Sequence, residues 1–272
     1  MISLLLASIL TVVPFDHTDW DRFLKKFVNE NGEVNYSAVK KDPKLLNRYL
    51  TKLKNISSQE LVDWSREEQL ALFINAYNAG VIKLIVDHFP VKTVMNIPGF
   101  WEQQAIQIAA FKSEDLEEIE ANVYSLTEIE NKELKRRFRD EKIIFALSKG
   151  SKGSPRLRQE AFTGPHLEGQ LYLATQEFVN NEKQNRIEPE AKKIYLSRLF
   201  QWHGNDFLIN WGDFPERKKW NLQEMAVLSF FAHYLEDPKK VEYLKEEEYK
   251  VRYSSFDWRL NDWRPGADQT KS

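Results

Sequence analysis

The chain of 272 residues contains no cysteine. This absence excludes disulfide bonds, thiolate nucleophiles, and zinc or iron–sulfur sites that cysteine would ligate. The chain also lacks a large excess of either charge, because 39 basic residues oppose 41 acidic ones and leave a net charge of -2. No surplus of positive charge is available to hold a phosphate backbone, so we expect no nucleic-acid partner.

Sequence motifs for metal and phosphate sites are missing as well. No H-E-x-x-H motif occurs, and no two histidines are spaced as H-x-x-x-H. The glycine-containing segment SKGSKGS at residues 148–154 matches neither the Walker pattern nor G-x-G-x-x-G, although Lys149 and Lys152 could hold an anion there. We therefore expect no metal and no cofactor, and we interpret this segment as a flexible surface loop.

Apolar side chains are plentiful. Hydrophobic residues make up 42% of the chain and aromatic residues 13%, including 8 tryptophans. Such a chain can bury a sizeable core, which excludes global disorder.

The N-terminal run ISLLLASILTVV, from Ile2 to Val13, is shorter than the ~20 residues that span a bilayer. It resembles the apolar region of a secretory signal, and a polar segment, DHTDWD, follows it. We expect residues 1–14 to be a signal peptide or an uncleaved anchor, with any membrane association confined to this segment. The alternative is a buried N-terminal helix or strand of a cytosolic protein.

Helical patterns dominate the rest of the chain. Ser65 and Glu68 form a capping box that predicts a helix over 66–88, apolar nearly all round and ended by Pro90. A second capping box, Ser125 and Glu128, begins a short helix that reaches about residue 138. Apolar spacing predicts further helices over 20–27, 45–53, 166–179 and 225–235.

Three short segments are candidate strands, at 34–36, 143–147 and 249–253. Ser154-Pro155 reads as a helix N-cap followed by proline at the first helical position. We predict an α+β fold: one helix-dominated domain over residues 15–263, with a small β-sheet and a central buried helix. The tail at 264–272 is expected to be disordered.

Several motifs, taken together and in order, resemble the domain of unknown function 547 family. They are WDRFLKKFVNENGEVNY, LALFINAYNAGVIKLI, YSLTEIENKELKRRFRDEKIIFAL, SKGSPRL, LSRLFQWHGNDF and FDWRLNDW. The resemblance covers nearly all of residues 15–263. It implies a bacterial protein that is secreted or associated with the cell envelope, and it implies no particular activity.

Two positions depart from the family pattern. Many relatives carry Cys-Pro where this chain has Ser154-Pro155, and a histidine where it has Asn131. A cysteine–histidine pair would be a natural catalytic hypothesis for those relatives, and this chain could not use it. A serine needs an adjacent base to become a nucleophile, so we interpret Ser154 as a capping residue.

Other polar residues of these motifs are candidates for a site. Asn75 and Asn78 share one face of the central helix, either in a structural polar network or as the polar floor of a cleft. Glu130 could be a general base or the ion-pair partner of Arg136 or Arg137. His203 and Asp206 lie together beside aromatic residues, where a carboxyl pKa could shift.

The sequence leaves three functions open. The first is an exported protein of the cell envelope that binds a small-molecule or peptide ligand without turnover, with Asn75, Asn78, Asn131 and Lys152 as ligand-binding candidates. The second is a hydrolase of peptides or envelope polymers, with Ser154, Glu130, His203 and Asp206 as catalytic candidates. The third is a protein-interaction module, which the high tryptophan content favours.

We predict that the chain is exported, because its apolar N-terminal run has the character of a signal. Cell fractionation should recover the protein in the periplasm, in the medium or on the membrane. Recovery of full-length protein from the cytosol alone would contradict this prediction.

Overall fold

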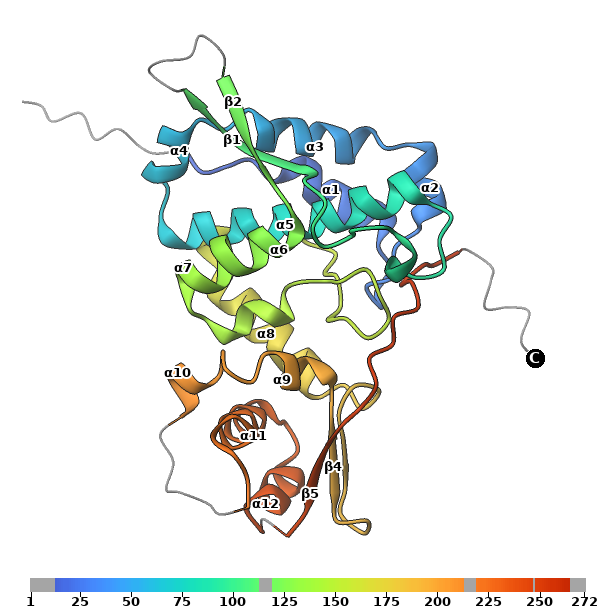
Figure 1. Ribbon diagram of the computed structural model, residues 1–272, viewed down its shortest axis with the longest axis vertical. Coiled ribbons are helices and arrows are strands. Elements are labelled where there is room, and N and C mark those ends of the chain that lie inside the picture. Colours follow the sequence, from blue (N-terminus) through green and yellow to red (C-terminus); the bar gives the residue numbers. More distant parts are fainter. Residues whose placement is uncertain (1–12, 113–118, 213–218, 247, 265–272) are drawn as a thin grey trace, which may run out of the picture.

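The structure is a computed structural model and describes residues 13–112, 119–212, 219–246 and 248–264 (Figure 1). The apolar run expected to direct export lies outside these ranges except for Val13, and the tail expected to be disordered lies outside them except for Arg264. The described chain is helix-dominated, with two small sheets, which confirms the predicted α+β class.

The upper part of the molecule in Figure 1 is a group of helices packed around a long central one. The surrounding elements are α1 (Thr18–Phe27), α2 (Tyr36–Lys41), α3 (Lys44–Lys54), α4 (Ser58–Asp63) and the 3₁₀ turn η1 (Val94–Asn96). An antiparallel hairpin, β1 (Ile106–Lys112) and β2 (Ile119–Tyr124), also packs on this group. Sequence analysis did not predict this hairpin.

The central helix is α5 (Arg66–His88), with the predicted boundaries. Both halves of the Ser65–Glu68 capping box are present, and the side chains from Leu70 to Ile82 are buried on every side of the helix. In the part of the chain that the structure describes, α5 alone has the length and hydropathy of a membrane span. However, 89% of its most apolar stretch is buried inside the protein, as expected of a core helix.

A middle layer follows α5 along the chain. It consists of α6 (Leu126–Glu128), the π-helix η2 (Ile129–Lys135), α7 (Arg136–Phe138), the 3₁₀ turns η3 (Glu141–Phe145) and η4 (Gly164–His166), and α8 (Leu167–Val179). The capping box of Ser125 and Glu128 begins this layer as predicted.

The lower part combines helices with a three-stranded sheet. Its elements are β3 (Arg186–Glu188), β4 (Lys193–Leu196), α9 (Arg198–Trp202), α10 (Leu208–Trp211), α11 (Leu222–Tyr234), α12 (Pro238–Glu246) and β5 (Lys250–Tyr253). The strand order is β3-β4-β5, with β4 antiparallel to β3 and parallel to β5.

The upper and lower parts have separate hydrophobic cores that two elements join. Helix α8 gives Leu171 to the upper core and Phe178 to the lower one. The turn η3 does the same with Ile143 and Phe145. Helix α8 and the turn η3 are therefore packed against both cores.

The C-terminal segment 254–263 runs from β5 back up to the upper part (Figure 1). The Lys152 N–H donates to the Arg259 carbonyl at 2.8 Å, and the Val34 N–H donates to the Asn261 carbonyl at 2.8 Å. This segment, which carries the FDWRLNDW motif, ties the lower sheet to the loop around Lys152.

Two of the three predicted strands are wrong. Residues 143–147 are a buried 3₁₀ turn and the chain after it, because a short apolar run is compatible with either conformation. Of residues 34–36, only Val34 forms a bridge, and Tyr36 already begins α2 behind the Asn35 cap. The prediction over 249–253 is confirmed by β5.

Asn75→Leu should lower the free energy of unfolding by several kcal/mol. The Asn75 amide donates to the Phe162 carbonyl at 2.7 Å and accepts from the Phe162 N–H at 3.0 Å, and each buried group left unpaired costs about 1–3 kcal/mol. Urea denaturation measures the loss. The control is Asn47→Leu, the same change at an exposed position of α3, and equal stability of the two variants would contradict the prediction.

Candidate functional site

The two asparagines of α5 each hold a different loop. Asn78 donates to the Ala146 carbonyl at 2.9 Å and accepts from the Ser148 N–H at 2.9 Å. Asn75 holds Phe162 in the same two-bonded way and also contacts the His17 ring at 3.2 Å. Both amides thus form a structural network, in which Asn78 fixes the start of the loop at 148–154 and Asn75 fixes the chain at Phe162.

The segment 148–154 is a loop that is buried apart from the exposed Lys152, which corrects the prediction of a flexible surface loop. Gly150 has a positive φ of 69°, and a Cβ there would lie 2.5 Å from Ile85. A Cβ on Gly153 would lie 2.8 Å from the Asp257 nitrogen in the C-terminal segment. Glycine is therefore required at both positions by conformation or by close packing.

Ser154 is not a helix N-cap, because no helix begins at Pro155. Its hydroxyl oxygen instead accepts from the Lys149 and Ser151 N–H groups, at 3.0 and 3.3 Å, and lies 2.8 Å from the Ser151 hydroxyl. The serine satisfies loop amides in the way that a cap satisfies helix amides. The sequence pattern was right about the chemistry of the hydroxyl and wrong about the structure it stabilises.

On the other face of this loop, Lys149 enters a buried group of charged side chains. Its ammonium lies 2.9 Å from Glu130 Oε2, and the Tyr77 hydroxyl donates to the same oxygen at 3.4 Å. The Lys149 ammonium also lies over the Trp101 ring, 5.5 Å from its centroid. The side chains of Glu130 and Lys149 are only 13% and 10% exposed.

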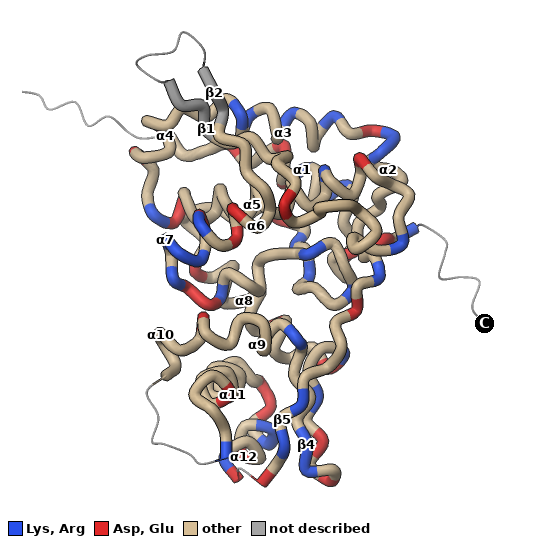
Figure 2. The backbone as a smooth tube through the Cα atoms, viewed as in Figure 1, with Lys and Arg blue, Asp and Glu red and all other residues tan. Residues whose placement is uncertain are grey.

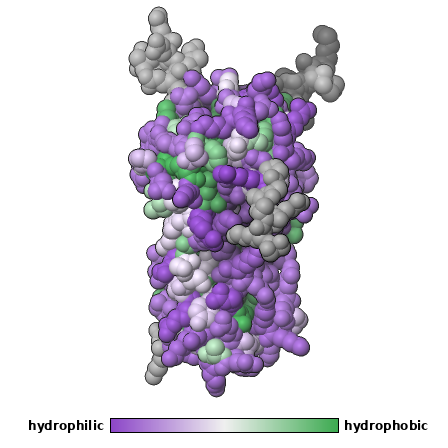
Figure 3. Space-filling view, turned by 90° about the vertical axis from the view of Figure 1, so that its right-hand side faces the viewer, coloured by the Kyte–Doolittle hydropathy of each residue, from purple (hydrophilic) through white to green (hydrophobic). Residues whose placement is uncertain are grey.

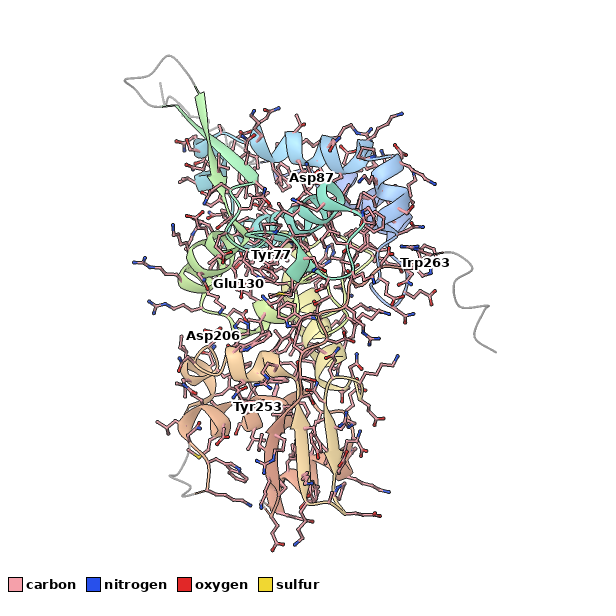
Figure 4. All side chains as sticks on the ribbon, turned by 45° about the vertical axis from the view of Figure 1, so that its right-hand side comes forward. Tyr77, Asp87, Glu130, Asp206, Tyr253 and Trp263 are labelled. Carbon is pink, nitrogen blue, oxygen red and sulfur yellow. The ribbon has the colours of Figure 1, made fainter. Side chains whose placement is uncertain are left out.

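His203 and Asp206 complete this group from the lower part of the molecule. His203 Nδ1 lies 3.1 Å from Asp206 Oδ2, where it donates, and His203 Nε2 lies 3.8 Å from Glu130 Oε1. The Lys135 ammonium bridges the two acids, at 3.0 Å from Asp206 and 3.8 Å from Glu130. Figure 4 shows Tyr77, Glu130 and Asp206 following one another down the junction between the two parts. We call Glu130, Lys135, Lys149, His203 and Asp206 the charge cluster.

The charges of the cluster determine its ionisation. Burial alone would raise the pKa of Glu130, but the charge of Lys149, that of His203 once it is protonated at acidic pH, and that of Lys135 outweigh burial and lower that pKa to about 2. Burial likewise opposes ionisation of Asp206, and the His203 hydrogen bond together with Lys135 holds its pKa below the usual value. Burial lowers the pKa of His203. At neutral pH both carboxyl groups of the cluster are therefore ionised, and the imidazole is neutral.

Glu130 lies in the π-helix η2, an uncommon conformation that occurs often at functional sites. There it turns inward to Lys149, which corrects the prediction of an ion pair with Arg136 or Arg137. Arg137 pairs instead with Glu133, one turn earlier on the exposed side. A pairing across 19 residues to Lys149 depends on the tertiary fold, so helical spacing did not predict it.

The remaining candidates lie outside the cluster. Asn131 is exposed, and the next residue, Lys132, pairs with Glu128. Lys152 lies on the opposite face of the loop from the cluster, 3.4 Å from Glu33. The structure therefore brings Glu130, His203 and Asp206 together and leaves Ser154, Asn131, Asn75 and Asn78 in other environments.

The sequence patterns did not single out Tyr77 and Lys135 for this environment, and they indicated a surface loop for Lys149. The available signal was the position of Lys149, which follows the apolar run at 143–147 and precedes two glycines. A lysine buried there would require an acidic partner.

Lys152 and Ser154 line a pocket of about 830 Å³ between the upper and lower parts. The pocket walls come from the turn at 30–33, the loop at 151–156, α8 and the chain after it, and the C-terminal segment. Four basic and four acidic side chains line it, and three pairs among them neutralise each other: Lys152–Glu33, Arg156–Glu177 and Arg259–Asp257. The other polar lining consists mainly of serine hydroxyls and of asparagine and glutamine amides.

Charge is also balanced over the molecule as a whole. Figure 2 shows acidic and basic residues interspersed along the described chain of both parts. Among the described residues, no group of three or more histidine, aspartate or glutamate side chains is arranged to hold a metal ion. The arrangement therefore offers hydrogen-bonding groups to a ligand more readily than a net charge.

Comparison with known proteins gives one result. Residues 61–179 match the model of a family described as protein of unknown function, DUF547. The match supports the family that the motifs indicated, over the part of the chain that holds α5, Glu130, Lys149 and Ser154. His203, Asp206 and the C-terminal segment lie beyond the matched range. No curated protein and no solved structure matches the chain.

Glu130→Gln should destabilise the protein at pH 7 by about 3 kcal/mol, because it leaves Lys149 buried without its counter-charge. The folded-state pKa of Glu130, about 2, lies below its usual 4.5. Its contribution is therefore complete above pH 4.5 and is lost as the pH falls toward 2.

Urea denaturation of the wild type and the variant from pH 7 to pH 3 tests this prediction. The difference between their unfolding free energies should shrink as the pH falls below 4.5. Glu242→Gln is the control, because Glu242 is 71% exposed and its ion pair with Lys245 lies at the surface. A difference that stays constant with pH would contradict the role given to Glu130.

Proposed function

We propose that this protein is an exported protein of the bacterial cell envelope that binds a neutral polar ligand without changing it chemically. The observation that carries the proposal is the pocket of about 830 Å³ at the junction of the two cores. Its volume lies in the range of ligand pockets, and junctions between structural units are a common place for them. Export is supported by the apolar N-terminal run and by the family resemblance of the motifs.

The chemistry of the pocket favours a neutral ligand. An anion site would present an excess of cations, whereas Lys152, Arg156 and Arg259 each face an acid within the pocket lining. The two charged residues that remain, Lys183 and Glu30, have opposite signs, so the lining carries no excess of positive charge. The hydroxyl and amide groups that remain can donate to and accept from uncharged polar groups.

The geometry gives less support to the alternative of a hydrolase. A glycosidase needs one carboxyl group that remains protonated near neutral pH, but the pKa values of Glu130 and Asp206 are both lowered. Among the hydrogen bonds of the described residues, the side-chain partner of the Ser154 hydroxyl is Ser151, which is no base.

Thermal unfolding with uncharged probes tests the binding proposal. Cellobiose, chitobiose and a trialanine peptide capped at both ends should be screened, and at least one should raise the melting temperature with increasing concentration. Asn181→Trp should abolish the rise, because Asn181 is an exposed residue of the pocket lining and indole would fill the space. Asn47→Trp on α3 is the control and should leave it unchanged.

The same samples discriminate binding from hydrolysis. We expect every probe to be recovered intact and Ser154 to remain unlabelled by a fluorophosphonate. Cleavage that disappears in a folded Ser154→Ala variant would favour the hydrolase. A melting temperature that no probe shifts, or a shift that Asn181→Trp retains, would contradict binding in this pocket.

A further inference from the structure

Beside the pocket, aromatic side chains form a partly exposed surface. Phe256 and Trp258 have ring centroids 4.4 Å apart, and Trp202 lies 5.1 Å from Phe256 and 5.8 Å from Trp258. Trp202 is 48% exposed, and Met95 nearby is 59% exposed. We call Trp202, Phe256 and Trp258 the aromatic ledge. Figure 3 shows that hydrophobic surface is limited on the face it views, which is mainly hydrophilic.

The ledge adjoins the pocket through Phe256, which lines the pocket. A second, shallower depression is lined by Phe256 and Trp258 together with Met95 and Thr93. It shares Ser255, Phe256, Asp257 and Arg259 with the pocket, so the same stretch of the C-terminal segment forms a wall of both. A ligand that leaves the pocket over this wall would meet the aromatic rings.

The ledge is held in place from several directions. Trp202 ends α9 of the lower part, and Trp258 lies in the C-terminal segment, which is bonded to the loop at 152–153. Trp258 also packs on Trp101, at 6.1 Å between centroids, and the Trp101 ring in turn contacts Lys149. Aromatic rings fixed in this way lose little conformational freedom when a ligand stacks on them.

We propose that the ligand is an oligosaccharide, which places its hydroxyl groups in the pocket and stacks a sugar ring on the aromatic ledge. This inference rests on the proposed function of the pocket and names its ligand class. A pyranose ring has an apolar face of C–H groups and an edge of hydroxyls, which matches aromatic rings beside hydroxyl and amide groups.

Other ligands that stack on aromatic rings fit less well. A single-stranded nucleic acid needs cations along its phosphates. The depression beside the ledge is lined by one basic side chain, that of Arg259, and Asp257 neutralises it. A lipid chain needs a deep apolar cavity, and the lining of the pocket is largely polar. A proline-rich peptide also docks on aromatic rings, and the experiment below separates it from a saccharide.

The test compares saccharides of two lengths. Titrations of cellotetraose, chitotetraose and the corresponding disaccharides, followed by tryptophan fluorescence and calorimetry, should show tighter binding of a tetrasaccharide. Trp202→Ala should weaken tetrasaccharide binding by about fivefold to tenfold and leave disaccharide binding unchanged. Trp202→Phe should restore most of the loss. Tyr172→Ala, at an aromatic side chain 44% exposed on α8, is the control and should have no effect.

Each result decides between the proposals. If Asn181→Trp abolishes binding while Trp202→Ala changes the affinity for neither the tetrasaccharide nor the disaccharide, binding in the pocket is supported and the ledge is not a subsite. If only the capped peptide binds in the pocket, the proposed function stands and the saccharide is excluded. A proline-rich peptide whose binding alone depends on Trp202 would also overturn the saccharide. Tetrasaccharide binding that depends on Trp202 but survives Asn181→Trp would support the ledge and contradict the pocket.

Discussion

The burial of α5 on every side is the constraint on which the rest of the structure depends. A helix without a solvent-facing side cannot satisfy polar side chains with water, so Asn75 and Asn78 must take partners from other segments. Those partners are backbone groups of Phe162 and of Ala146 and Ser148. The central helix therefore fixes two loops by hydrogen bonds with directional geometry, and one of these loops continues into both the charge cluster and the pocket.

The charge cluster has a matching role between the two cores. Glu130 and Lys149 belong to the middle layer, whereas His203 and Asp206 follow α9 of the lower part. Buried charges are costly unless each finds its counter-charge, so a displacement of one part against the other would be opposed electrostatically. Apolar packing at α8 and η3 brings the two cores together, and the cluster specifies how they meet.

Sequence patterns within one helical turn predicted local structure well. They failed where the same pattern is compatible with two different structures. The capping box at Ser65 and Glu68 predicted the start of α5 because both of its bonds form within one turn, and Pro90 predicted its end. The run Ile143–Leu147 resembled a strand because burial, and not conformation, selects its residues. The partnership of Glu130 with Lys149 and His203 joins segments 19 and 73 residues apart. Only the tertiary fold brings these segments together. The motifs therefore indicated Glu130 and His203 as candidates, but they could not predict that these residues lie in one site.

The loop at 148–154 connects the two halves of the candidate site through one short piece of backbone. Its Lys149 side chain lies in the charge cluster, while Lys152 and Ser154 face the pocket, and the Ser154 hydroxyl accepts from the Lys149 N–H. Moving the pocket wall would therefore break a buried ion pair and two hydrogen bonds from backbone N–H groups to the Ser154 hydroxyl at once. Gly153, packed against Asp257, adds the C-terminal segment to the same unit. A pocket wall held in this way is organised before any ligand arrives, which lowers the ordering cost of binding. A neutral ligand, which gains little from Coulomb attraction, needs such a wall more than an ion does.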